Sequence, residues 1–266
     1  MKKVLIVILL TTIFFDIKSQ ERSFEAPDYE KISLEIQDSS SVYYYPKLMS
    51  RLVAYDSTLT IVDYRHLYYG YIFQKKYQPY WKSSDEEKLI KFYRSEKISE
   101  KDYDKIIELA SHSINEFPFD LRQMNFLGYI YHLKGDEEMA LKINMRFHGT
   151  FAAIMSTGDG KTCETGYHVI SVSHEYVFLN FFQFNMTSQA LTGDCDYLSF
   201  EKDQRNINGV YFNVKRLMSK NLKISNQNKK RQLEYEETTC NFIDYCVAFW
   251  LWTEEKRENI SNRLLS

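Results

Sequence analysis

The sequence predicts an α+β protein that is mostly α, in which an N-terminal helical region leads into a small antiparallel β-sheet. Between residues 24 and 155, apolar residues recur at spacings of three and four, which is typical of amphipathic helices. A glycine-rich break at Ser156–Gly160 follows, and beyond it the apolar period falls to two, which is typical of strands. We therefore expect helices over residues 20–155 and, over residues 156–219, a sheet that packs on them.

The first 19 residues are predicted to be a secretory signal peptide and not part of the fold. Lys2 and Lys3 give a positive start, Val4–Phe15 is an apolar run, and Ser19–Gln20 lies at a polar end suited to cleavage. The apolar run is shorter than the roughly 20 residues that span a bilayer. We predict a periplasmic or secreted protein with no membrane span after cleavage.

Composition excludes a nucleic-acid binder. The formal net charge is −2, and the sequence has no basic stripe of the kind that contacts phosphates. A length of 266 residues is sufficient for one large or two small domains with a core.

The first helices are predicted from periodicity and from residues that suit helix starts. Pro46 falls in a first turn, where proline is tolerated, and Thr60 with Asp63 forms a variant of the capping box. The loop Gln78–Trp81 ends this part of the chain. The predicted helices are Phe24–Asp38, Tyr43–Ala54 and Ile61–Phe73.

Further helices follow, with breaks at Pro118 and Gly135. Proline closes a helix because it cannot continue it, and glycine suits the turn of a helical hairpin. The predicted helices are Asp85–Glu96, Glu100–Glu116, Phe119–Leu133 and Asp136–Met155.

Residues of this middle region fall on one frame of about 34 residues, the period of the tetratricopeptide repeat. Gly128 and Ala140 are the small residues, and Met124 and Leu127 are among their large partners. Arg94 stands where the preceding repeat would carry glycine, so the match covers about one and a half repeats. An unrelated amphipathic hairpin ending in proline gives a similar pattern. We predict a tetratricopeptide-like hairpin at about 100–155, from Tyr103, Pro118, Leu127, Gly128, Tyr131, Gly135 and Ala140.

Alternation after residue 166 predicts strands. His168, Ile170, Val172, His174 and Tyr176 would share one face of the first strand. The segment 220–266 is a tail of uncertain structure, with an apolar piece at Phe242–Trp252 that predicts either a helix or a strand. The further predicted strands are Val177–Phe182, Tyr197–Glu201 and Val210–Val214.

Four cysteines can pair in an oxidising compartment, and three connectivities are possible. We favour Cys163–Cys195, which would tie the end of the helical region to a later strand. The spacings match no zinc ribbon or finger. Cys240 and Cys246 are alternatively two buried thiols in an apolar segment.

The loop after the last predicted helix is the best candidate site. Two glycines flank an aspartate, and acidic and histidine residues follow, a set that suits a divalent cation or an acid/base pair. The alternative is a turn into the sheet that uses glycine and aspartate for their backbone freedom, with histidines in the core. We assign no metal and no cofactor. The candidate residues are Gly158, Asp159, Gly160, Glu164, His168 and His174.

Aromatic residues crowd the N-terminal third. Tyr64, Tyr68 and Tyr71 have helical spacing and are predicted to form a buried stripe. Tyr69, Tyr80 and Trp81 do not fit this stripe, so they are candidates for an exposed partner-binding surface.

Eight separated strings carry a family resemblance: Ala26–Tyr29, Tyr43–Met49, Asp63–Gly70, Pro118–Arg122, Thr157–Gly160, His168–Ile170, His174–Tyr176 and Tyr211–Val214. Together they resemble a family of secreted bacterial proteins known as domain of unknown function 4919. The resemblance covers roughly Phe24–Met218, and the tail from about Lys220 departs from the pattern. It implies secretion but no activity and no catalytic residues.

The leading hypothesis is a non-enzymatic interaction module that binds a peptide, protein or glycan partner of the cell envelope. Helix-repeat scaffolds form extended grooves, and the sequence has no recognisable nucleophile–base motif. The alternative is a metal-binding protein or hydrolase centred on Asp159, Glu164, His168 and His174. A purely structural envelope component is a third interpretation.

Overall fold

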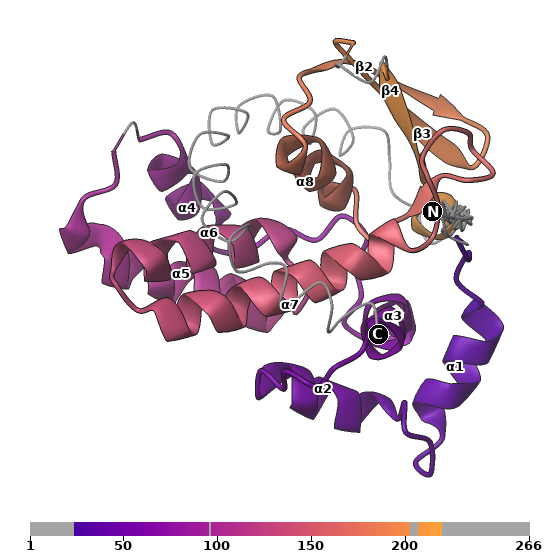
Figure 1. Ribbon diagram of the computed structural model, residues 1–266, viewed down its shortest axis with the longest axis horizontal. Coiled ribbons are helices and arrows are strands. Elements are labelled where there is room, and N and C mark those ends of the chain that lie inside the picture. Colours follow the sequence, from indigo (N-terminus) through magenta and orange to yellow (C-terminus); the bar gives the residue numbers. More distant parts are fainter. Residues whose placement is uncertain (1–23, 96, 203–206, 220–266) are drawn as a thin grey trace, which may run out of the picture.

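Helices form one side of the molecule and a small sheet forms the other (Figure 1). The computed structural model describes residues 24–95, 97–202 and 207–219. The predicted signal peptide at 1–19 and the tail at 220–266, with its Phe242–Trp252 segment and Cys240 and Cys246, lie outside the described residues. The α+β class with a majority of helix is confirmed.

The N-terminal helices begin where capping residues predict. In α3, the Thr60 hydroxyl accepts from the Asp63 N–H at 3.2 Å and the Asp63 carboxylate accepts from the Thr60 N–H at 2.8 Å, which confirms the capping box. Pro46 lies in the first turn of α2, as predicted. Glu35 of α1 bonds His66 of α3 at 2.7 Å and so joins these two helices. The elements are α1 (Tyr29–Gln37), α2 (Tyr45–Val53), α3 (Ile61–Gly70) and the short 3-10 helix η1 (Tyr71–Phe73).

The middle of the chain is a series of packed helices that confirms the predicted segments. Asp120 caps α6 and Asp136 caps α7, each by accepting from the backbone N–H three residues further on. Gly135, with φ +79°, forms the turn between them. The elements are α4 (Glu86–Tyr93), η2 (Glu100–Asp102), α5 (Tyr103–Glu116), α6 (Leu121–Leu133) and α7 (Glu137–Met155).

The predicted hairpin of helices is present, with its small residues in the interior. Gly128 of α6 and Ala140 of α7 are buried, as are Met124 and Leu127, whereas Tyr131 is half-buried. Burial of this set is also what a generic helical hairpin requires. The relation to the tetratricopeptide repeat therefore stays a prediction.

The predicted strands between residues 167 and 182 are mostly wrong. Only Tyr167–His168 forms a strand, β1, and Ser173–Phe181 forms a helix, α8. Consecutive residues from His174 to Leu179 are all buried, because α8 lies between the sheet and the helices (Figure 1). A segment buried on every side has no clear period, so its sequence does not distinguish a strand from a helix.

The sheet is mixed and not purely antiparallel as predicted. Its strand order is β1-β4-β3-β2, and β1 runs parallel to β4, with Tyr167 opposite Phe212. A parallel neighbour requires a long crossover, which α8 and the β2–β3 hairpin provide here. The predicted strands near 197–201 and 210–214 are confirmed, and β2 was not predicted. The strands are β1, β2 (Met186–Thr192), β3 (Cys195–Phe200) and β4 (Gly209–Asn213), followed by α9 (Lys215–Ser219).

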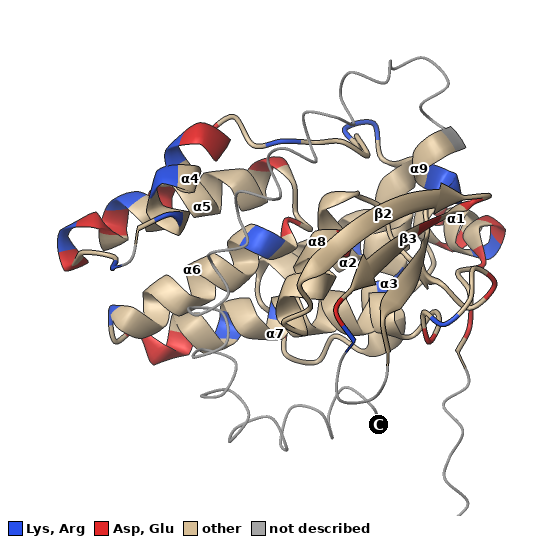
Figure 2. Ribbon diagram, turned by 90° about the horizontal axis from the view of Figure 1, so that it is seen from above, with Lys and Arg blue, Asp and Glu red and all other residues tan. Residues whose placement is uncertain are grey.

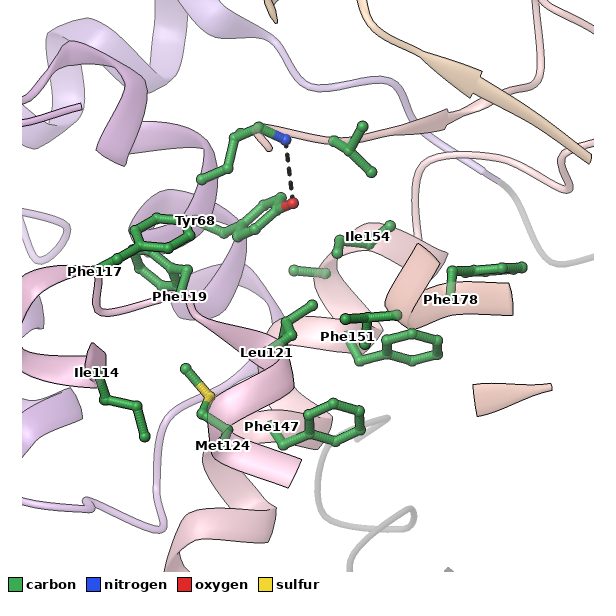
Figure 3. Close-up of a cluster of buried hydrophobic side chains, with 14 of the residues drawn as sticks. Tyr68, Ile114, Phe117, Phe119, Leu121, Met124, Phe147, Phe151, Ile154 and Phe178 are labelled. Atoms are coloured by element: carbon green, nitrogen blue, oxygen red, sulfur yellow. Dashed lines mark hydrogen bonds between the residues drawn. The ribbon is translucent and has the colours of Figure 1, made fainter. Parts of the chain in front are cut away.

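A continuous core joins the two parts, with α3 at its centre. The Tyr68 hydroxyl, fully buried, accepts from the Ile170 N–H at 3.2 Å, a bond drawn in Figure 3, and donates to His174 Nδ1 at 2.6 Å. His174 Nε2–H donates to the Phe119 carbonyl at 2.9 Å. One side chain of α3 thus links the loop after β1, the start of α8 and the chain before α6.

The disulfide Cys163–Cys195 is confirmed. It joins the loop after α7 to the first residue of β3. Within the described ranges, no helix is long and apolar enough to cross a membrane.

Candidate functional site

The Gly158-Asp159-Gly160 segment is a tightly closed turn. The N–H groups of Asp159 and Gly160 both donate to the Thr165 carbonyl, at 3.0 and 2.9 Å. A Cβ atom at Gly158 would lie 2.0 Å from that oxygen, so only glycine fits there. The turn is fixed to the sheet because the Tyr211 N–H donates to the Gly160 carbonyl at 2.9 Å.

The Asp159 side chain is hydrogen bonded within this turn. Its carboxylate accepts from the Thr165 hydroxyl at 2.6 Å and from the Lys161 N–H at 3.1 Å, and lies 3.2 Å from the Lys161 ammonium. Burial opposes the charge, but these hydrogen bonds outweigh it and lower the pKa of Asp159. The carboxylate therefore stabilises the loop and is poorly placed to accept a proton from a substrate.

The remaining predicted site residues are not brought together. Glu164 is exposed, and His174 is buried in the core with both ring nitrogens hydrogen bonded. Burial lowers the pKa of His174 to about 3, so the ring is neutral. The described residues contain no group of three or more His, Cys, Asp or Glu side chains that could hold a metal ion. The expected shared strand face of His168 and His174 is wrong, because α8 begins between them.

The predicted aromatic surface is also different. Tyr64, Tyr68 and Tyr71 are buried, as predicted, but Tyr69 is fully buried too, so its expected exposure is wrong. Its hydroxyl donates to the carbonyls of Ala153 and His168, at 3.3 and 3.1 Å. Tyr80 and Trp81 are half-buried and pack against the core, and their role in partner binding stays a prediction.

His168 is the predicted residue that does lie in a chemically distinctive place. It ends β1 and is half-buried, and its N–H donates to the Thr157 hydroxyl at 2.9 Å. Burial, assisted by the positive charge of Arg65, lowers the pKa of His168 to about 4. The imidazole is therefore neutral near pH 7, with one N–H donor and one acceptor nitrogen. The described residues provide no hydrogen-bond partner for the ring.

Arg65 of α3 lies beside it. One terminal nitrogen donates to the Ser156 hydroxyl at 2.5 Å, and the other donates to the carbonyls of Glu25 and Ala26, at 2.9 and 3.5 Å. All of these partners are neutral, and no carboxylate of the described residues pairs with Arg65. A half-buried charge of this kind is normally paired, because desolvation is costly.

Tyr29 and Arg216 complete the group. The guanidinium carbon of Arg216 lies 4.4 Å from the centre of the Tyr29 ring, and that ring is 6.3 Å from the His168 ring. Figure 2 shows the Lys and Arg residues of α9 close to α1. Burial raises the pKa of Tyr29, with Arg216 and Arg65 opposing it, so the hydroxyl stays protonated. We call Tyr29, Arg65, His168 and Arg216 the Arg65–His168 cluster.

The cluster offers hydrogen-bond donors and positive charge, and it lacks the pairing that activates a nucleophile. The hydroxyl bonded to Arg65, that of Ser156, donates to the Ala153 carbonyl at 2.7 Å. It is therefore held by structural bonds and is not bonded to a base. The arrangement is suited to binding.

Tyr29, Arg65 and Arg216 were missed by the sequence analysis. They come from α1, α3 and α9, and no periodicity relates residues so far apart. One signal was available, because Tyr29, Arg65 and His168 all belong to strings through which the sequence resembles its family.

Comparison with known proteins identifies the family. Residues 30–223 match the family described as Domain of unknown function (DUF4919), and the chain belongs to it. No curated protein and no solved structure matches the chain.

Proposed function

We propose that the protein is a secreted or periplasmic, non-enzymatic binding protein that holds a peptide, protein or glycan partner of the cell envelope at the Arg65–His168 cluster. The observation that carries the proposal is Arg65. Its half-buried guanidinium has only neutral partners among the described residues, and it lies near the neutral ring of His168, whose centre is 6.3 Å from that of the Tyr29 ring. A partner that accepts hydrogen bonds would provide the acceptors that these donor groups lack among the described residues.

Two observations support an extracytoplasmic location. The Cys163–Cys195 disulfide suits an oxidising compartment, where such bonds persist. The positive, apolar and polar sequence of residues 1–19 is that of a secretory leader.

Capture from the envelope and secreted fractions of the source organism tests the proposal. The bait is the chain from Gln20 to Ser266, cross-linked to its partners and analysed by mass spectrometry. Tyr29→Phe removes one hydroxyl, and Arg216→Gln removes one charge. The matched controls are Tyr44→Phe, at another half-buried tyrosine, and Arg94→Gln, at another exposed arginine.

We expect the wild type and both controls to recover the same partner, and the two cluster variants to lose it. Equal recovery by all five proteins would reject the cluster as the binding site. If Trp81→Ala loses the partner while the two cluster variants still recover it, the partner binds instead at the half-buried surface of Tyr80 and Trp81.

A further inference from the structure

The strand β2 is an open edge of the sheet. Among the described residues it pairs only with β3, and it stands last in the strand order β1-β4-β3-β2. Most of its residues are exposed, and Leu191 is 52 % exposed. Because consecutive residues of a strand point to opposite faces, both faces of β2 meet solvent. The exposed residues are Thr187, Ser188, Ala190, Leu191 and Thr192.

The outer edge of β2 carries backbone groups that β3 does not use. The turn after Thr192 has two residues, so Thr192 and every second residue before it exchange hydrogen bonds with β3. The N–H and C=O groups of Gln189 and Leu191 therefore point away from β3. A row of such groups is a template for another strand.

The sequence of β2 lacks the residues that normally protect an edge strand. Edges are commonly blocked by charged side chains, by proline or by a bulge. β2 reads Met-Thr-Ser-Gln-Ala-Leu-Thr, with no charge and no proline. Its register shift, between Met186 and Ser188, lies at the start of the strand and leaves Ser188–Thr192 regular. This regular part is open to pairing.

The strand is held in place before any second strand arrives. The Gln189 side chain accepts from the Tyr176 hydroxyl of α8 at 2.8 Å and donates to Asp196 of β3 at 3.1 Å. The Cys163–Cys195 disulfide fixes the first residue of β3. Because β2 is already ordered, its pairing loses little conformational entropy.

We propose that two copies of the protein pair through β2, antiparallel about a two-fold axis at Ala190, and so join two four-stranded sheets into one. In this register Gln189 of each copy lies opposite Leu191 of the other, and each such pair exchanges two backbone hydrogen bonds. The two Ala190 residues meet at the axis as a non-hydrogen-bonded pair, whose Cα atoms approach to about 4.5 Å. Alanine is small enough for this approach.

The charge pattern favours a second copy over a charged partner. Since β2 has no charged side chain, no like charges meet when it pairs with itself, and a charged strand would find no opposite charge on it. Asp194, in the turn beyond the strand, is paired with Lys215 of α9 at 2.8 Å. A contact limited to one strand from each copy is small, so we expect a weak dimer.

The dimer is independent of the Arg65–His168 cluster. β1, which ends at His168, is the opposite edge of the sheet from β2. Pairing through β2 therefore leaves the cluster open, and this inference does not rest on the proposed function.

Analytical ultracentrifugation and amide hydrogen exchange measured by nuclear magnetic resonance test the inference on the oxidised chain from Gln20 to Ser266. We expect a monomer–dimer equilibrium at protein concentrations up to about 1 mM, the range of weak complexes. The Gln189 and Leu191 amides should exchange rapidly in the monomer and more slowly as the dimer forms. The Ala190 amide, which bonds to β3, should be protected at every concentration.

Charge changes at the axis identify the paired residue. Ala190→Glu and Ala190→Lys each place like charges opposite each other, so each should weaken self-association by about fivefold. An equimolar mixture of the two should restore association, because opposite charges then meet. Val53→Glu and Val53→Lys, at an exposed residue of α2, change the net charge equally and should have no effect, alone or mixed.

Leu191→Pro is a second variant that acts on the backbone. It removes an outward N–H and no bond to β3, so it should weaken the dimer by about tenfold while the Cys163–Cys195 disulfide still forms.

A protein that stays monomeric at about 1 mM would overturn the inference. A dimer that responds to neither Ala190 substitution would also overturn it, because the copies would then meet at another surface. Protection of the Gln189 and Leu191 amides in the monomer would count against it equally, since another part of the same chain would then occupy the edge.

Discussion

At the scale of single residues, Gly149 of α7 lies against the Tyr64 ring of α3. A Cβ atom there would lie 2.2 Å from the Tyr64 ring, so α3 approaches α7 only because this residue is glycine. Glycine inside a helix normally costs about 1 kcal/mol relative to alanine. Glycine is needed at this position although it disfavours the helix, because the Tyr64 ring occupies the space that a side chain would fill.

Gly149→Ala should therefore destabilise the protein, although it improves helix propensity. The clash is with a buried ring, and overpacking of this kind costs about 1–3 kcal/mol. Urea denaturation measures the change in the free energy of unfolding. In a Tyr64→Ala background the same substitution should be neutral or stabilising by up to about 1 kcal/mol. A neutral effect in the wild-type background would contradict the close approach.

At the scale of elements, the predictions held where one side of a segment faces solvent and failed where both sides are buried or both are mostly exposed. Helices such as α1, α4 and α5 bury apolar residues on one face, and the caps at Thr60, Asp120 and Asp136 are local signals. The helix α8 is buried on every side, so the spacing of its apolar residues did not indicate a helix. The strand β2 is mostly exposed, so its few apolar residues did not indicate a strand.

At the candidate site, features set by neighbouring residues were predictable from the sequence, and features set by tertiary contacts were not. The glycines and Asp159 were recognised because a tight turn depends on neighbouring residues, and here the alternative interpretation, a turn, is the one observed. The contacts among Tyr29, Arg65, His168 and Arg216 depend on how α1, α3, β1 and α9 pack together. Tertiary packing of this kind leaves no mark on the spacing of residues in the sequence.

The disulfide is the clearest link between elements, because it closes a loop of 32 residues between the turn after α7 and β3. Chain-entropy arguments for a loop of this length predict a contribution of about 3–4 kcal/mol to the free energy of unfolding. The double variant Cys163→Ser with Cys195→Ser should lose this amount in urea denaturation. Reduction of the wild type should have the same effect.

Cys240→Ser with Cys246→Ser is the control for that experiment. It should leave the stability unchanged under oxidising conditions and keep its response to reductant. A wild-type protein whose stability does not respond to reductant would argue against the Cys163–Cys195 contribution.

At the scale of the whole molecule, the stability should fall as the solution becomes mildly acidic. His174 and His168 have pKa values of about 3 and 4 in the folded protein, below the ordinary value of about 6.5. Between about pH 4 and 6.5 the unfolded chain therefore binds protons at these histidines that the folded protein does not. The free energy of unfolding then rises with pH in this window and is lost as the pH falls through it.

Each histidine should contribute a slope approaching about 1.4 kcal/mol per pH unit well below pH 6.5. The carboxylates whose pKa is lowered, such as Asp56 and Asp159, act at lower pH, because their ordinary value is 3.8. Asp120 acts in the opposite direction, since burial raises its pKa and favours its protonated form. Urea denaturation between pH 5 and 6.5 measures the combined slope, and a histidine variant isolates the part that its ring contributes.

His168→Gln should remove one part of the slope, because the ring that takes up fewer protons in the folded chain than in the unfolded chain is then absent. A slope unchanged by His168→Gln would show that its ring is protonated in the folded protein near pH 6.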